Sequence, residues 1–339
     1  MRIKFAVLGA GSFGIALCKL ISRNVGFEVV LWSAVEEEIV DLLKNGESKK
    51  FLPGIALNQN MMKLTTKLSE ISDADIVVFA VASKFVRDVA NRVKNFLKRD
   101  CIVVNIAKGL EEHSFKRMSQ VILDVLGKNQ KFAVLSGPSH AEEIAKLIPT
   151  TVVVAATTVQ TAEYLQKILS SSIFRIYVSD DMVGVELGGA LKNPIALAVG
   201  ICDGLKLGEN VKAALMTRGI AEIGRLGVKL GAKARTFAGL SGVGDLIVTC
   251  TSLHSRNKRA GILIGQGKSV LNALNEVNMA VEGYLTTKVV FELSKKCGVS
   301  MPIINGLYEV LYYDKSAKSV MFNLMNRPVK HEYEKMWFD

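Results

Sequence analysis

The N-terminal part of the chain alternates short apolar runs with segments of helical periodicity. Continuous runs of β-branched and other apolar residues predict strands that are buried on both faces of a sheet. The runs are Ile3–Leu8, Glu28–Trp32, Ile76–Val81, Cys101–Ile106, Phe132–Ser136, Thr151–Ala155 and Phe174–Val178. Helical stretches such as Lys84–Leu97 and Ser114–Leu126 lie between them. This alternation predicts an α/β fold with a doubly wound, mostly parallel sheet.

Beyond about residue 180 the strand-like runs almost stop, and apolar residues recur at the three- and four-residue spacing of amphipathic helices. The helical segments expected here are Val183–Ile201, Val211–Leu226, Lys258–Gln266, Tyr284–Lys296 and Ile303–Leu311. We therefore expect two domains. An α/β domain would cover residues 1–185, and an all-helical domain would cover residues 186–339.

A glycine-rich turn follows the first predicted strand. Gly9–Gly14 reads G-x-G-x-x-G, the helical segment Ile15–Ile21 follows it, and a second strand comes next. Strand, glycine turn, helix and strand within about thirty residues indicate a dinucleotide-binding unit rather than a turn without a ligand. Gly9 would allow the tight turn, Gly11 would let the backbone approach a pyrophosphate, and Gly14 would let helix and sheet pack closely. The pyrophosphate would lie at the helix N-terminus.

The end of the second strand does not decide between NAD and NADP. An NAD site usually has Asp or Glu here for the ribose hydroxyl, whereas an NADP site has Arg nearby. Ser33–Val35 provides neither, and Glu36–Glu38 is better placed to open the next helix, where acidic residues suit the helix dipole. Lys49 and Lys50 are expected to be solvated, although a folded-back loop would bring them to a 2′-phosphate. The cofactor is NAD or NADP, with the preference open.

Composition and cysteine use narrow the class of protein. The chain has 339 residues, 49% of them hydrophobic and 22% charged, as in ordinary soluble globular proteins. No run approaches the ~18–20 uninterrupted apolar residues of a membrane span. The apolar N-terminal run enters the glycine turn, so we expect no export signal. The five cysteines include no C-x-x-C pair, and the four histidines form no H-x-x-x-H pattern. The sequence therefore implies no disulfide framework and no metal site. This use of cysteine is what we expect of a protein in a reducing cytoplasm.

The formal net charge of +11 does not indicate a nucleic-acid partner. The basic residues are spread along the chain, and the densest cluster, Ser255–Arg259, is short and lacks interleaved aromatic residues. A basic surface that concentrates anionic small molecules accounts for the excess equally well.

Glycine-flanked polar clusters follow several predicted strands and interrupt the helical half. Ligands bind at the carboxyl edge of doubly wound sheets, so we expect clusters that follow strands to converge. The clusters are Lys108-Gly109, Ser136–Ala141, Gly188–Pro194, Gly242–Asp245, Ser255–Asn257 and Val281–Gly283. Together with the glycine turn they resemble the NAD(P)-dependent glycerol-3-phosphate dehydrogenases of the bacterial soluble type. The matching segments, in order along nearly the whole chain, are GAGSFG, AKGLE, SGPSHAEE, GGALKN, GLSGVGDLIVTC, SRN and VEGYLTTK.

The resemblance implies an N-terminal Rossmann domain followed by an all-helical C-terminal domain. It implies an oxidoreductase that interconverts sn-glycerol 3-phosphate and dihydroxyacetone phosphate by hydride transfer with NAD(P), and so feeds glycerophospholipid synthesis. The partner would be this small phosphorylated substrate, and a homodimer is the oligomeric state that the resemblance suggests.

Oxidising a secondary alcohol requires a group that takes the hydroxyl proton. Lys192 matches the family's catalytic lysine. A lysine's ordinary pKa of ~10.4 is too high for this task, but burial beside cations such as Lys108 and Arg256 lowers it. Asp245 and Thr249 lie four residues apart on one helical face, where they can bind a hydroxyl or hold the lysine. The structural alternatives are a solvated lysine and an aspartate that caps a helix.

The resemblance also implies binding residues. Arg256, with Ser255 and Asn257 beside it, offers a planar fork for phosphate, although a basic surface turn would have the same composition. The expected substrate-binding residues are Lys108, Gly137, Ser139, Lys192, Asp245, Ser255, Arg256 and Asn257, of which Lys108, Gly137 and Ser139 would come from the Rossmann side. The expected cofactor-binding residues are Gly9, Gly11, Ser12, Phe13, Gly14, Ser33, Lys108, Ala141, Arg256 and Glu282. Phe13 replaces a common Trp, and Ser33 stands where many relatives have Arg or His.

Two other functions share some of these features. Two-domain dehydrogenases of the 3-hydroxyacyl-CoA or 6-phosphogluconate type have the early glycine turn, but we do not expect them to combine Gly242–Asp245 with Ser255–Asn257. A non-catalytic regulator that binds NAD(P)H would be marked by loss of the lysine or the aspartate. Both Lys192 and Asp245 are present.

Overall fold

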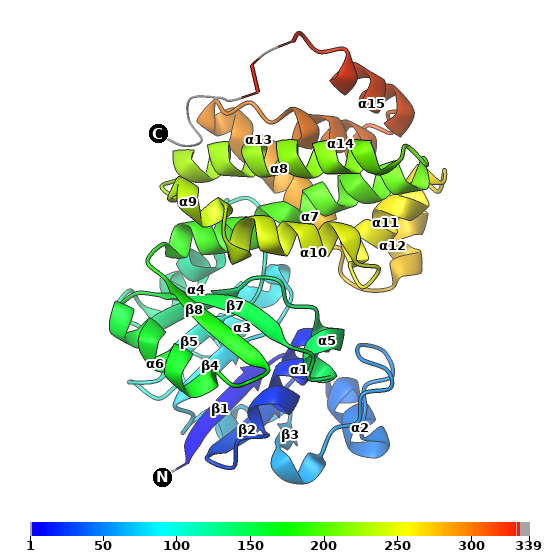
Figure 1. Cartoon of the computed structure of the whole chain (residues 1–339). Helices are drawn as coiled ribbons and strands as arrows, with labels where there is room; N and C mark the ends of the chain where they lie inside the picture. Colours follow the sequence, from blue (N-terminus) through cyan, green and yellow to red (C-terminus); the bar gives the residue numbers. More distant parts are fainter. Residues whose placement is uncertain (1, 330, 333–339) are drawn as a thin grey trace. The chain divides into compact units, whose positions relative to one another are not determined.

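The computed structural model describes residues 2–329 and 331–332, which form two compact units (Figure 1). Unit 1 comprises Met1–Ala107 and Met118–Met182, and unit 2 comprises Lys108–Arg117 and Val183–Asp339. The sequence predicted one boundary after residue 185. The structure instead divides the chain after Met182 and also assigns Lys108–Arg117, an excursion from the α/β half, to unit 2.

Unit 1 is built on one eight-stranded sheet with the order β3-β2-β1-β4-β5-β6-β7-β8. Neighbouring strands are parallel except β6 and β7, which are antiparallel. The strands are β1 Ile3–Leu8, β2 Phe27–Trp32, β3 Lys63–Thr65, β4 Ile76–Phe79, β5 Ile102–Asn105, β6 Phe132–Ser136, β7 Thr150–Ala156 and β8 Phe174–Ser179. The predicted doubly wound, mostly parallel sheet is therefore confirmed. The sequence did not predict the edge strand β3, because three residues are too few to show an apolar run.

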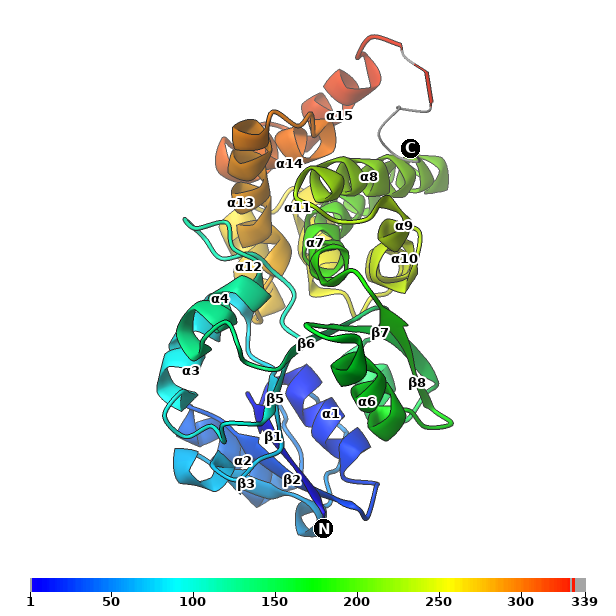
Figure 2. The same ribbon diagram turned by 90° about the vertical axis from the view of Figure 1, so that its left-hand side faces the viewer.

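Helices cover both faces of this sheet. The helices of unit 1 are α1 Ser12–Ile21, α2 Glu36–Asn45, α3 Val86–Val93, α4 Met118–Leu126, α5 Ala141–Ala145 and α6 Val159–Leu169. Short 3₁₀ turns lie at Gln59–Met61, Leu68–Ile71 and Ser83–Phe85. Figure 2 shows α3 and α4 on one side of β1 and β5, and α1 on the other. The apolar strands are buried from both directions, which explains their continuous hydrophobic pattern.

Helix α4 begins at Met118 and not at Ser114, where the periodicity placed it. His113 and Phe115 have positive φ angles of 69° and 59°, which a helix does not accept. Leu110 in the same segment is buried in the hydrophobic core of unit 2. Tertiary packing of Lys108–Arg117 therefore outweighs its local helical pattern.

Unit 2 is helical in its described residues, apart from one isolated bridge between Leu110 and Arg117. Its helices are α7 Met182–Gly204, α8 Glu209–Lys229, α9 Ala234–Phe237, α10 Asp245–Thr251, α11 Arg256–Gly265, α12 Val270–Val277, α13 Glu282–Cys297, α14 Pro302–Tyr312 and α15 Ala317–Met325. A π-helical turn, Leu240–Gly244, directly precedes α10. The predicted helical C-terminal domain is confirmed.

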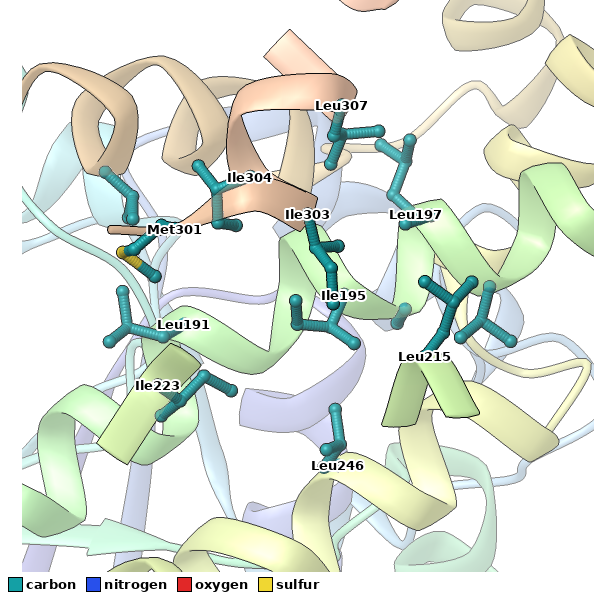
Figure 3. Close-up of a cluster of buried hydrophobic side chains, with 14 of the residues drawn as sticks. Leu191, Ile195, Leu197, Leu215, Ile223, Leu246, Met301, Ile303, Ile304 and Leu307 are labelled. Carbon is teal, nitrogen blue, oxygen red and sulfur yellow. The ribbon is translucent and has the colours of Figure 1, made fainter. Parts of the chain in front are cut away.

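Helix α7 runs through the core of unit 2. All residues from Gly184 to Cys202 are buried. Figure 3 shows Leu191, Ile195 and Leu197 of this helix among apolar side chains of the neighbouring helices. By length and composition α7 could cross a membrane, but its apolar window is completely buried inside the protein, as in the core helix of a globular unit.

Candidate active site

One buried carboxylate in unit 2 binds two lysine side chains. Asp245, the first residue of α10, has no solvent exposure. Its Oδ1 accepts a hydrogen bond from Lys192 Nζ of α7, and its Oδ2 accepts one from Lys108 Nζ at 2.7 Å. Lys192 Nζ also donates to Thr249 Oγ1 at 2.7 Å. The structure thus brings together Lys192, Asp245 and Thr249. It also places Lys108, one of the two cations expected beside Lys192, on the same carboxylate.

Backbone geometry positions these groups. Thr249 lies one helical turn after Asp245, and its hydroxyl donates to the Asp245 carbonyl at 2.6 Å, which fixes its orientation. Gly188, one turn before Lys192, lets α7 lie against the π-helical turn that leads into α10. A Cβ atom at Gly188 would be 2.3 Å from the Ser241 carbonyl oxygen. The small residue therefore allows the close approach that joins Lys192 to Asp245.

Burial makes Lys192 an unusual lysine. It is 6% exposed, and loss of solvation lowers its pKa from the ordinary 10.5 to about 7. The negative charge of Asp245 opposes this change, and the positive charge of Lys108 adds to it. The Lys192 amino group can therefore gain and lose a proton near neutral pH, which is the requirement for general acid–base chemistry.

A second set of hydrogen bonds joins three of the segments singled out in the sequence. Asn257 Nδ2 donates to Asn193 Oδ1 at 3.0 Å, and Asn257 Oδ1 accepts from the Gly283 N–H at 2.8 Å. A Cβ atom at Gly283 would be only 2.7 Å from the Asn193 carbonyl oxygen, so glycine permits this contact. Asn193 was not among the predicted site residues, although its position next to Lys192 was a signal that could have found it.

These hydrogen bonds also fix the positions of the residues next to Asn257 and Gly283 in the sequence. Arg256 is the half-buried first residue of α11, next to Asn257, and Glu282 is the first residue of α13, next to Gly283. Ser255 is the N-cap of α11, and its hydroxyl accepts from the Lys258 N–H at 3.2 Å. Asn257 is buried, and both its amide oxygen and its amide nitrogen form hydrogen bonds within the protein. Its side chain therefore holds neighbouring segments together rather than facing open space.

The glycine turn of unit 1 has the geometry of a dinucleotide loop. Gly9 has φ of +119°, and a Cβ atom there would lie 2.8 Å from Val81 Cγ1. A Cβ atom at Gly14 would lie 2.1 Å from the Gly9 carbonyl oxygen, so only glycine allows the helix to pack here. A Cβ atom at Gly11, the N-cap of α1, would meet no atom within 4 Å. Gly11 thus borders open space beside the first N–H groups of a helix, where a pyrophosphate fits.

The other predicted cofactor residues of unit 1 differ in their surroundings. Ser12 Oγ donates to the Phe51 carbonyl at 2.6 Å, and Phe13 is partly buried against the core of unit 1. Ser33 is 3% exposed, and its hydroxyl donates to Glu38 Oε2 at 2.5 Å. Ser33 is therefore turned toward helix α2.

The SGPSHAEE segment also belongs to unit 1. Gly137 has φ of +130°, and Ser139 Oγ donates to its carbonyl at 2.8 Å. Ala141 is buried at the start of α5, where His140 is the N-cap. Lys108 was expected to complete the substrate site, with Gly137 and Ser139, from the Rossmann side. In the structure Lys108 belongs to unit 2 and binds Asp245.

The described residues include no group of three or more His, Cys, Asp or Glu side chains that could hold a metal ion.

Comparison with known proteins places these features in one family. Residues 4–162 match the family model for the N-terminus of NAD-dependent glycerol-3-phosphate dehydrogenase, and residues 181–322 match the model for its C-terminus. The chain belongs to the NAD-dependent glycerol-3-phosphate dehydrogenase family. The glycerol-3-phosphate dehydrogenase [NAD(P)+] of Moorella thermoacetica is 50% identical over 334 residues, which cover 98% of this chain and 99% of the relative.

Further relatives of the glycerol-3-phosphate dehydrogenase family agree over the full length. The enzyme of the same name from Pelotomaculum thermopropionicum is 49% identical, covering 99% of this chain and 97% of the relative. The crystal structure of glycerol-3-phosphate dehydrogenase from Coxiella burnetii has a TM-score of 0.92 at 35% identity, covering 96% of this chain and 99% of that one. This family membership excludes the 3-hydroxyacyl-CoA and 6-phosphogluconate types as the family of this chain.

Proposed function

We propose that this protein interconverts sn-glycerol 3-phosphate and dihydroxyacetone phosphate with NAD or NADP as the hydride carrier. Membership of the family supports the substrate pair and the cofactor. The observation that carries the proposal is a buried lysine of lowered pKa held by a carboxylate and a hydroxyl, Lys192 with Asp245 and Thr249. A non-catalytic dinucleotide-binding protein would have no need to retain this costly arrangement.

Lys192 is the proposed general base. In the oxidation it takes the proton of the C2 hydroxyl through Nζ, and in the reduction it returns that proton to the carbonyl oxygen. Asp245 and Thr249 hold Nζ in one orientation. Lys108 binds the same carboxylate, and its positive charge helps to keep the pKa of Lys192 low. When bound, the dinucleotide supplies the hydride acceptor or donor.

The remaining predicted residues are proposed to bind. Gly9, Gly11 and Gly14 shape the loop for the pyrophosphate, together with the backbone of Ser12 and Phe13. Arg256 and Ser255 bind the phosphate of the substrate, with Asn257 bracing Arg256. The further proposed contacts are Lys108, Gly137 and Ser139 to the substrate, and Ser33, Lys108, Ala141, Arg256 and Glu282 to the cofactor.

We also propose a cellular setting for this activity. The product sn-glycerol 3-phosphate would supply the backbone of glycerophospholipids in the cytoplasm. The working form would be a homodimer.

A direct assay tests the activity. When dihydroxyacetone phosphate is mixed with the protein, NADH or NADPH should be consumed. The loss of absorbance of the reduced nicotinamide measures this consumption. If neither nucleotide is consumed while one of them binds, the protein is a dinucleotide-binding regulator instead.

The rate should depend on pH in opposite directions for the two reactions. Alcohol oxidation needs neutral Lys192, so kcat/KM should rise with pH through about 7, the pKa to which burial lowers this lysine. Ketone reduction needs the protonated form, so its kcat/KM should fall above the same pH. Initial rates at constant ionic strength between pH 5 and 9 check both limbs. Two profiles that move in the same direction would contradict the assignment.

Arg256→Ala should weaken the use of the substrate's phosphate. Loss of a charge-assisted hydrogen bond costs about 1.5–3 kcal/mol, a roughly ten- to hundredfold fall in kcat/KM. Arg259→Ala is the matched control, because Arg259 is an exposed arginine on the same helix. With dihydroxyacetone, which lacks the phosphate, Arg256→Ala should lose less activity than with dihydroxyacetone phosphate, because only the proposed contact of Arg256 with the cofactor is then lost. Arg259→Ala should change the rate little with either substrate. An equal loss on both substrates would mean that the phosphate binds elsewhere.

A further inference from the structure

The end of strand β2 is tied directly to the glycine turn. The Gly9 N–H donates to the Trp32 carbonyl at 2.7 Å, and β1 and β2 pair in register from Ile3 with Phe27 to Leu8 with Trp32. The residues just beyond Trp32 therefore begin beside the loop that receives the pyrophosphate. In dinucleotide-binding folds the adenosine ribose lies at this strand end, where its 2′ position is recognised.

The side chain at this position does not end in open space. Ser33 is buried, its hydroxyl accepts from the Val35 N–H at 3.1 Å, and it donates to Glu38 Oε2 at 2.5 Å. Glu38 is the third residue of α2 and is half-buried. The hydrogen bond from Ser33 thus holds the carboxylate of Glu38 at the end of β2, although Glu38 itself belongs to α2.

This carboxylate retains the capacity to bind. Within residues 2–329 and 331–332, Glu38 Oε1 has no hydrogen-bond partner, and no ammonium or guanidinium group pairs with Glu38. Ala34 and Val35, which separate Ser33 from α2, provide no positive charge. A carboxylate accepts hydrogen bonds from ribose hydroxyls, whereas it repels a 2′-phosphate, which carries a charge of about −1.5 to −2 near neutral pH.

We propose that Glu38, held by Ser33, is the specificity-determining residue of the dinucleotide site and makes this protein select NADH over NADPH. The inference rests on the proposed function only in requiring that a dinucleotide binds at the glycine turn. Sequence reasoning assigned the 2′ position to Ser33 and treated Glu38 as a helix-opening residue. The hydrogen bond between the two gives the strand end a negative charge that the residue at position 33 does not itself carry.

Direct binding tests this without turnover. NADH and NADPH are titrated separately into the full-length protein, and each Kd is measured from the nicotinamide fluorescence or by calorimetry. The wild-type protein should bind NADH at least about tenfold more tightly than NADPH. Glu38→Gln should reduce that ratio at least about fivefold, mainly by tightening NADPH, because the repulsive charge is removed.

Two further variants separate the charge of Glu38 from its position. Glu37→Gln is the matched control, since Glu37 is an exposed neighbour in the same helical turn and should leave the ratio within about twofold of wild type. Ser33→Ala releases Glu38 and should give an intermediate ratio. Equal changes in the Glu37 and Glu38 variants would overturn the proposal, because helix charge in general would then set the preference.

One outcome assigns the 2′ position to another residue. The Lys50 ammonium lies 5.1 Å from the centre of the Phe51 ring, and the Phe51 carbonyl binds Ser12 of the glycine turn. Equal wild-type affinity for the two nucleotides, with Lys50→Ala weakening NADPH alone, would overturn the role of Glu38. If neither nucleotide binds, the proposed function fails as well, whereas equal binding of both removes this inference only.

Discussion

Lys192→Ala is expected to abolish most turnover while leaving the affinity for the dinucleotide nearly unchanged. The variant removes the group proposed to move the substrate proton, and general acid–base groups contribute roughly 10²- to 10⁴-fold. The glycine turn belongs to unit 1 and Lys192 to unit 2, so the substitution leaves the loop's own backbone intact. Steady-state kcat in both directions, with Kd for the nucleotide, measures the two effects separately.

A surface-paired lysine of the same unit provides the control. Lys212 binds Asp203 at 2.8 Å and lies outside the Asp245 cluster, so Lys212→Ala should retain most of the wild-type kcat. Lys192→Arg keeps a positive charge but cannot release it, so it should be as inactive as the alanine variant. A Lys192→Ala protein with more than a tenth of the wild-type kcat would refute the role of Lys192.

Asp245→Asn is expected to reduce turnover by roughly 10²-fold or more and to move the remaining activity to lower pH. The carboxylate raises the pKa of Lys192 against the effect of burial, so its removal should lower that pKa further. Lys192 and Lys108 would also lose their shared partner inside the protein. Breaking a buried ion pair in this way costs about 3–5 kcal/mol, so the thermal midpoint should fall too.

Asp203→Asn is a closely matched control. Asp203 also binds two lysines, Lys212 at 2.8 Å and Lys258 at 3.2 Å, but it is a fifth exposed and, among the described residues, forms no ion pair with Lys192. Its loss should leave the midpoint of the pH–rate profile unchanged. If both asparagine variants shift the profile alike, Asp245 acts through general electrostatics and not as the positioning partner of Lys192.

The sheet was predictable because burial on both faces leaves a strong mark on sequence. Strand β1 was predicted with the bounds that the structure gives, and β2 and β5 to within one or two residues. The three-residue edge strand β3 has no such pattern, since only one face of a short strand needs to be apolar. Helix α2 begins at Glu36, as its acidic first turn indicated.

The candidate site was predictable where spacing along one helix decides the geometry. Asp245 and Thr249 are four residues apart, so any α-helix places them on one face, and the structure binds both to Lys192. The partner of Asn257 could not be predicted in this way. Asn193 is 64 positions away, and only the packing of α7 against α11 brings the two amides together.

The sequence by itself determined the two kinds of domain, the glycine turn and the residue types available for proton transfer, because these depend on local periodicity and short motifs. Tertiary structure decided which unit holds Lys108, how one carboxylate comes to serve two lysines, and that Ser33 binds Glu38. The contacts of Asp245 join segments that are far apart in the sequence, whereas the contact of Ser33 with Glu38 depends on how the end of β2 turns into α2. The tertiary structure also decides the lowered pKa of Lys192, because desolvation is a property of the folded interior.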